Sequence, residues 1–125
     1  MDDALRLSTH RAGGTLTIVV AGALDLATAP QLLAYLETVF TQLPNGVRGN
    51  GQRGEGAAID RLVIDGGNVS FIDARGLGVL VTIKNLAGHH RLPLLLADIS
   101  TPIHRLLTIT DMHRHFSTSS APPSQ

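Results

Sequence analysis

Three aspartates, Asp25, Asp65 and Asp73, each stand directly after a short apolar run of the chain. In an open α/β sheet the carboxyl ends of the strands share one edge, where ligands usually bind. Carboxylate oxygens suit Mg²⁺, so such a cluster could support phosphotransfer to an aspartate. That chemistry also needs a lysine at the end of a strand, whereas the single lysine, Lys84, falls within a predicted helix. Because Asp25 and Asp73 also fit turns and helix caps, we expect no metal site.

Two glycine-containing stretches could hold a phosphate group. Residues 66–70 (GGNVS) lack the Lys-Ser/Thr pair that completes a phosphate loop, and residues 73–78 (DARGLG) lack a third glycine in dinucleotide register. Close packing of a helix start against a sheet explains Gly76 and Gly78 more simply. Backbone N–H groups at that helix start could still hold an anion.

The remaining nucleophiles and potential ligands form no catalytic pattern. No two histidines have the i, i+4 spacing of a helical metal site, and we expect surface positions for them. The six are His10, His89, His90, His104, His113 and His115. Ser70 and Ser100 fit a turn and a helix cap, and the absence of cysteine excludes thiol chemistry. We therefore expect no enzyme, no catalytic residues and no cofactor.

Length, charge and hydropathy narrow the class of protein. The 125 residues suit one domain, and the formal net charge is zero with scattered basic residues, which argues against nucleic-acid binding. No stretch approaches the roughly 18 apolar residues of a membrane span. The chain opens with acidic residues after Met1, whereas a secretory signal is basic there. We expect a cytoplasmic protein with neither a nucleic acid nor a membrane as partner.

Short apolar runs predict the strands that position these groups. They cover residues 5–7, 15–20, 62–64 and 94–97. Gly13 and Gly14 supply a hairpin turn between the first two strands. The continuous run at 62–64 indicates a strand covered on both faces, and the Gly-Gly-Asn sequence at 66–68 indicates a turn after it.

Three helices are predicted from apolar residues at three- and four-residue steps. The first has Thr28 as N-cap and Pro30 in its first turn, the second follows Asp73 and ends at Gly88, and the third starts at Ser100. Residues 113–116 could add a last short element. The order is strand, strand, helix, strand, helix, strand, helix, which predicts an α/β fold with a mixed sheet, parallel in its later strands.

Several segments, taken in order, resemble one known family. Residues 22–25 (GALD) are similar to the Gly-x-Leu-Asp segment of STAS domains. Residues 71–78 (FIDARGLG) look like that family's phosphorylation loop, written Phe-hydrophobic-Asp-Ser-Ser/Thr/Ala-Gly-Leu. Residues 103–112 resemble its C-terminal helix and the turn that follows. The resemblance covers about residues 5 to 116 and implies a STAS-like mixed β-sheet packed with α-helices.

The resemblance also implies a function, that of an anti-sigma factor antagonist. Such a domain binds an anti-sigma factor with a kinase-type ATP-binding fold, and phosphorylation of the serine after the loop aspartate breaks the complex. A phosphate adds nearly two negative charges at the docking surface, so repulsion and desolvation separate the partners. The residues matching that surface are Leu24, Asp25, Asp73, Ala74, Arg75 and Gly76.

This sequence departs from the family pattern at the phospho-acceptor position. Ala74 has no hydroxyl, and Arg75 is bulky and cationic where the family often has a small residue. We therefore expect an antagonist of an anti-sigma factor that regulates sigma-factor-dependent transcription without the usual serine switch. Ser70 and Thr28 are alternative hydroxyls, although neither has the family spacing from Asp73.

The predicted organisation is a STAS domain over residues 1–116, with a flexible Gly-rich loop at 44–58 and a disordered tail at 117–125. The sequence does not specify an oligomeric state. One alternative stays open: a STAS-type sensor that binds a nucleotide or a lipid, with Arg75 and the N–H groups of the helix start holding its phosphate.

Overall fold

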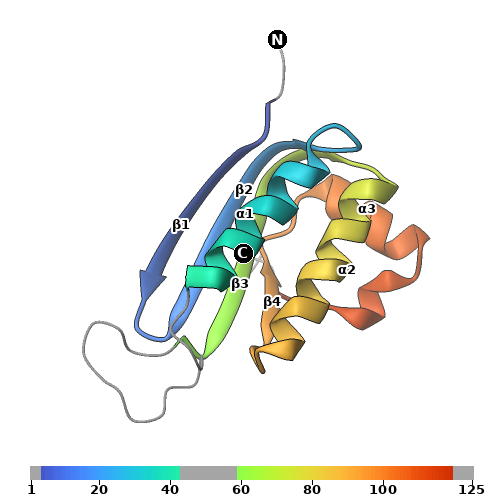
Figure 1. The fold of residues 1–125 in the computed structure, drawn as a ribbon. Coiled ribbons are helices and arrows are strands. Elements are labelled where there is room, and N and C mark those ends of the chain that lie inside the picture. The colour runs from blue at the N-terminus through green and yellow to red at the C-terminus, as the bar shows by residue number, and fades with distance from the viewer. Residues whose placement is uncertain (1–3, 43–58, 120–125) are drawn as a thin grey trace.

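The structure, a computed structural model, describes residues 4–42 and 59–119, which form one mixed sheet with helices packed on it (Figure 1). In chain order the elements are β1 (Arg6–Ala12), β2 (Thr15–Leu24), α1 (Ala29–Gln42), β3 (Arg61–Ile72), α2 (Ala74–His89), β4 (Leu94–Ala97), α3 (Thr101–Ile109), the 3₁₀ helix η1 (Met112–His115) and β5 (Ser117–Ser119). The predicted α/β fold and the predicted order of its first seven elements are confirmed.

The chain begins with the predicted hairpin. Strand β1 runs antiparallel to β2, and Ala12 lies opposite Thr15, so only Gly13 and Gly14 connect the strands. Gly13 has a φ of +62°, a left-handed conformation that favours glycine. The pair of glycines in the sequence therefore marks the turn correctly.

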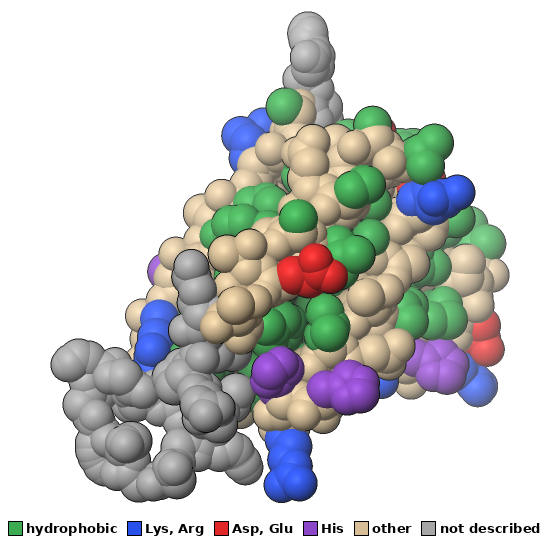
Figure 2. Space-filling view, viewed as in Figure 1, with side chains coloured by type: hydrophobic (Ala, Val, Ile, Leu, Met, Phe, Trp, Pro, Cys, Tyr) green, Lys and Arg blue, Asp and Glu red, His purple; other side chains and the backbone are tan. Residues whose placement is uncertain are grey.

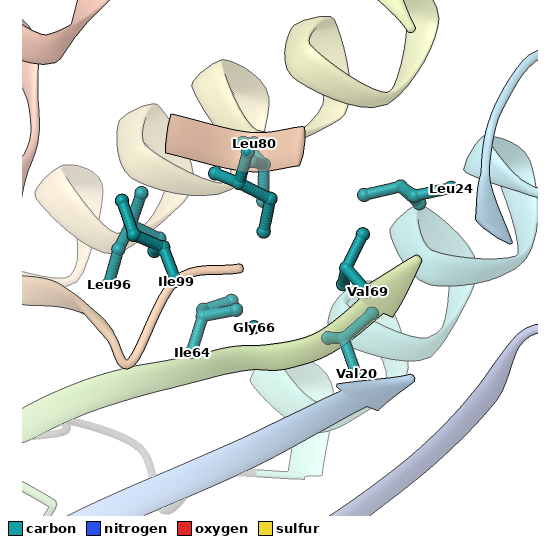
Figure 3. A pocket seen from close by; sticks show the side chains of 9 residues that line it. Val20, Leu24, Ile64, Gly66, Val69, Leu80, Leu96 and Ile99 are labelled. Carbon is teal, nitrogen blue, oxygen red and sulfur yellow. The ribbon is translucent and has the colours of Figure 1, made fainter. Parts of the chain in front are cut away.

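All the helices cover one face of the sheet. The strand order is β1-β2-β3-β4-β5, and every pair after the first is parallel. Right-handed crossovers that always step in the same direction place their helices on the same side. Figure 3 shows the result: a small apolar cavity lies between Val20 and Ile64 of the sheet and Leu80 of α2, and Ile103 of α3 also lines it.

The prediction that residues 62–64 are covered on both faces is wrong. Leu62 and Ile64 are buried under the helices, whereas Val63 between them is only half-buried. Strand β2 has the same alternation of buried and half-buried positions along all ten residues. A continuous apolar run gives no information about which side the helices occupy, and here the sequential strand order leaves one side of the described sheet without a helix.

The predicted turn at residues 66–68 is also wrong, because β3 continues through it to Ile72. Val19 pairs with Asp65 and Ala21 with Asn68, so β3 has one residue more than β2 over this stretch. That is a β-bulge, which glycines signal in the same way as a turn. The longer strand leaves Asp65 in mid-strand, away from the edge at which β3 ends.

The segment after α3 differs from the predicted tail. Residues 112–115 form η1, close to the short element predicted at 113–116. Residues 117–119 form the edge strand β5, parallel to β4, although the sequence predicts disorder from residue 117. Phe116, 7% exposed, packs in the core next to this strand. Residues 117–119 pair with β4 through the backbone, which needs no apolar side chains, so their polar sequence does not predict a strand. The loop predicted at 44–58 and the tail at 120–125 lie outside the described residues.

Candidate functional site

Asp73 joins the two loops that follow β2 and β3. It is the N-cap of α2: its Oδ1 accepts hydrogen bonds from Arg75 N at 2.9 Å and Gly76 N at 3.1 Å. Its Oδ2 accepts from the backbone N–H of Leu26 at 3.2 Å, and its own N–H donates to Leu24 O at 3.3 Å. One carboxylate therefore fixes both the start of α2 and the neighbouring loop.

Asp25 organises the loop between β2 and α1. Its Oδ1 accepts from Ala27 N at 3.0 Å and Thr28 N at 3.1 Å, which closes a turn before the helix. The hydroxyl of Thr28 donates to Ala23 O at 2.8 Å and accepts from Asp25 N at 2.9 Å. Thr28 directly precedes α1, as predicted, but its hydroxyl ties the loop to β2 instead of capping the helix.

The start of α2 approaches the end of β2 very closely. A Cβ placed on Gly76 would lie 2.4 Å from the carbonyl oxygen of Leu24, a separation that real side chains do not reach. Gly76 is buried, and the Leu24 side chain is only 1% exposed. Gly76 and Leu24 are two of the six predicted partner-binding residues, and both are buried beneath the surface of the site.

Four exposed side chains lie on or next to the loops after β2 and β3, and we call them the Ala74 surface: Leu26, Phe71, Ala74 and Arg75. Leu26 is 59% exposed and Phe71 51% exposed, so both present apolar side chains to solvent. Within the described residues, the Arg75 guanidinium has no hydrogen bond or ion pair. Figure 2 shows hydrophobic side chains at the upper edge of the molecule, where the loops after β2 and β3 lie in Figure 1. Leu26 directly follows the GALD segment and Phe71 is the first residue of the FIDARGLG segment, but neither is among the predicted partner-binding residues.

The structure does not bring the three aspartates together as a metal site. Asp25 and Asp73 lie on adjacent loops, but each caps backbone N–H groups of its own loop or helix. Asp65 lies in mid-strand, and its Oδ1 accepts from Gly67 N at 3.0 Å. Across residues 4–42 and 59–119, no group of three or more His, Asp or Glu side chains could hold a metal ion.

The histidines are mostly exposed, as predicted. The exception is His90, which is half-buried and stacks on Phe40 with ring centroids 4.9 Å apart. Ser100 directly precedes α3, as predicted, but its Oγ is buried and has no hydrogen-bond partner among the described atoms. No helix in the described segments is long and apolar enough to cross a lipid bilayer.

The chain belongs to the STAS domain family, whose model matches residues 6–122. Among solved structures, an anti-sigma factor antagonist from Mycobacterium paratuberculosis matches with a TM-score of 0.74 at 20% identity, over 95% of this chain and 88% of that chain. SpoIIAA of Bacillus in its phosphorylated form matches with a TM-score of 0.63 at 18% identity, over 96% and 93%.

RsbS from Moorella thermoacetica, solved as a variant, has a TM-score of 0.63 at 21% identity, over 94% of this chain and 88% of that chain. A sequence search of curated proteins finds no match. At these identities the structural matches establish the fold, and the confirmed fold class is the STAS arrangement of a mixed sheet with its helices.

Proposed function

We propose that this chain is an anti-sigma factor antagonist that binds its partner through the Ala74 surface and lacks the serine phospho-switch. The observation that carries the proposal is the position of Ala74. It is exposed at the first residue of α2, directly after the N-cap Asp73, where the family places its phospho-acceptor serine. A methyl group there cannot accept a phosphate. The structural match to an antagonist from Mycobacterium paratuberculosis supports the same class of partner.

The composition of the Ala74 surface also fits protein docking. Leu26 and Phe71 are large, apolar and exposed, and interfaces bury such side chains as anchors. Arg75 adds a cation with several donors, which favours a partner with carboxylates facing it. This chain would regulate transcription by occupying the anti-sigma factor, without catalysis. Cytoplasmic localisation belongs to the same proposal, because sigma factors act on RNA polymerase there.

The sensor alternative has weaker support at this position. A phosphate-bearing ligand would need free N–H groups at the start of α2. Asp73 Oδ1 already accepts from Arg75 N and Gly76 N, and the Asp73 carbonyl accepts from Leu77 N at 3.0 Å. A ligand would have to displace this carboxylate and would be repelled by its charge. We therefore favour the antagonist.

The test uses the purified chain with anti-sigma factors of the kinase-type ATP-binding fold. Binding is measured by isothermal titration calorimetry with and without Mg-ATP, and phosphate addition by intact-mass spectrometry. We expect a complex that survives ATP and a mass that does not change. A double variant, Ala74→Ser with Arg75→Ser, restores the family pattern and should gain one phosphoryl group and dissociate.

Two results would overturn the proposal in different ways. Phosphate addition to the unmodified chain, mapped to Ser70, Thr28 or another hydroxyl, would show that a phospho-switch exists. Failure to bind any anti-sigma factor of this fold, by a chain whose folding is confirmed by circular dichroism, would exclude the antagonist role itself.

A further inference from the structure

A second concave region lies at the far end of α2 from Ala74 and has no part in the proposed docking surface. It is a hollow of about 400 Å³ between the C-terminal part of α2, residues 92–94 at the start of β4, and residues 114–117. The helix rises about 21 Å between Ala74 and Gly88, at 1.5 Å per residue. The hollow is therefore at the opposite end of the sheet, where the parallel strands begin.

Basic side chains from two separate elements line this hollow. Lys84 comes from α2, and Arg114 and His115 come from η1, while no described carboxylate lines it. Lys84 has no hydrogen bond or ion pair within the described residues. The Arg114 Nε lies 3.5 Å from Asp111 Oδ1, so this ion pair uses one edge of the guanidinium and leaves its Nη groups as donors. Figure 2 shows His, Lys and Arg side chains along this lower edge of the molecule.

One part of the hollow's wall is apolar and makes these charges more effective. Leu92 and Phe116 are buried and Leu94 is half-buried, and all three line the hollow. Charges beside a low-dielectric wall interact more strongly than charges on an open surface. An anion that entered would meet the exposed cations Lys84 and Arg114 as well as the apolar side chains.

The C-terminal carbonyl groups of α2 would repel an anion if they were free. Within the described residues, three of the last four accept hydrogen bonds, those of Leu86, Ala87 and Gly88. The carbonyl of Ala87 accepts from Leu92 N at 2.8 Å and His90 N at 3.0 Å, and that of Gly88 accepts from Arg91 N at 3.0 Å. The turn that carries the chain from α2 to β4 thus reduces the negative potential at this end of the helix.

We propose that this hollow binds a small phosphate-bearing molecule, with Lys84 and Arg114 holding the phosphate group. Arg suits phosphate oxygens because its donors form a planar fork, and Lys adds a compact charge. The apolar wall beside them suits a nonpolar part of the same ligand. The inference does not rest on the antagonist role, because the hollow and the Ala74 surface share no residue.

The test is a titration of the full ¹⁵N-labelled chain followed by two-dimensional NMR. Inorganic phosphate and adenosine monophosphate are the probes, and sodium chloride at equal ionic strength is the reference. We expect saturable shifts at residues 84, 88 and 114–117, with a dissociation constant below about 1 mM for at least one probe. Tighter binding of the nucleotide by tenfold or more indicates an organic phosphate; equal binding indicates that the phosphate group alone is recognised.

The variants Lys84→Gln and Arg114→Gln, combined, should weaken binding at least tenfold. Arg105→Gln is the matched control, since Arg105 is an exposed cation on α3 outside the hollow, and it should bind as the unmodified chain does. Shifts no larger than those with sodium chloride, or binding that survives the double variant, would overturn the proposal. Saturable binding of a polyglutamate peptide, with no response to either phosphate probe, would also overturn the proposal.

Discussion

The carboxylate of Asp73 accepts a hydrogen bond from the backbone N–H of Leu26, 47 positions earlier in the sequence, at 3.2 Å. Its other oxygen caps α2 through Arg75 N and Gly76 N. The exposed Leu26 side chain and the first turn of α2 are therefore held by the same group. The position of Leu26 relative to Ala74 and Arg75 therefore depends on Asp73.

Replacing Asp73 tests that dependence. Asp73→Ala removes the acceptor of three backbone N–H groups, and we expect the free energy of unfolding to fall by about 2 kcal/mol, mostly from the lost cap. Asp73→Asn keeps a side-chain acceptor and should cost about 1 kcal/mol or less. Urea denaturation followed by circular dichroism measures both. Equal stability of the unmodified chain and the alanine variant would mean that this cap contributes nothing in solution.

Ser100, which is also predicted to cap a helix, should behave differently. Its Oγ is buried, and among the described residues it has no hydrogen-bond partner and makes no capping bond. The buried hydroxyl is therefore expected to destabilise the fold instead of stabilising it. We expect Ser100→Ala to change the free energy of unfolding by less than about 0.5 kcal/mol, or to raise it. The same urea series measures it. A loss near 1 kcal/mol, the usual effect of removing a serine cap, would show that the capping bond forms in solution.

These two caps show what the sequence can and cannot predict. A serine or an aspartate before an apolar periodic segment marks a helix start, and both α2 and α3 begin where that signal predicts. Whether the side chain then bonds to the helix depends on its rotamer and on the residues packed around it. Asp73 has the Leu26 N–H as an additional partner from a distant segment, which local sequence does not reveal.

Some features of the site can likewise be predicted from the sequence, and others cannot. The lack of a hydroxyl at Ala74 is evident from the residue type alone. The exposure of Phe71 is not evident from the residue type, because a large apolar residue is normally expected in the core. Phe71 directly precedes Ile72, another large apolar residue, which is only 7% exposed. Only the position of the helices on one face of the sheet determines which of the two is covered. The burial of Leu24, a predicted contact residue, follows from the same arrangement.

The close approach of α2 to β2 can be tested by comparing two glycine-to-alanine variants in the same helix. Gly76→Ala places a Cβ 2.4 Å from the Leu24 carbonyl oxygen, so the helix start must shift, and we expect a loss of more than about 2 kcal/mol in the free energy of unfolding. Gly78→Ala is the control. Gly78 is exposed in the same helix, and apart from the adjacent helix backbone no described atom lies within 4 Å of its Cβ position. Alanine there should stabilise by about 0.5–1 kcal/mol.

Thermal and urea denaturation of the two glycine variants should therefore shift in opposite directions. If both variants gained stability, the contact between the start of α2 and the end of β2 would be looser in solution than in the structure. The difference between the variants is informative, because each replaces glycine by alanine in the same helix.

The last prediction concerns the apolar side chains of the Ala74 surface. Because Leu26 and Phe71 are 59% and 51% exposed, Leu26→Ala and Phe71→Ala should change the free energy of unfolding by less than about 1 kcal/mol. If they anchor the anti-sigma factor, each should weaken its binding by about 2 kcal/mol, or roughly thirtyfold. Ile109→Ala is the matched control: Ile109 is 72% exposed at the end of α3, away from the strand ends that carry Ala74. Calorimetric titration measures the affinity of each of the three variants for the anti-sigma factor. Equal affinities for all three would place the docking surface elsewhere.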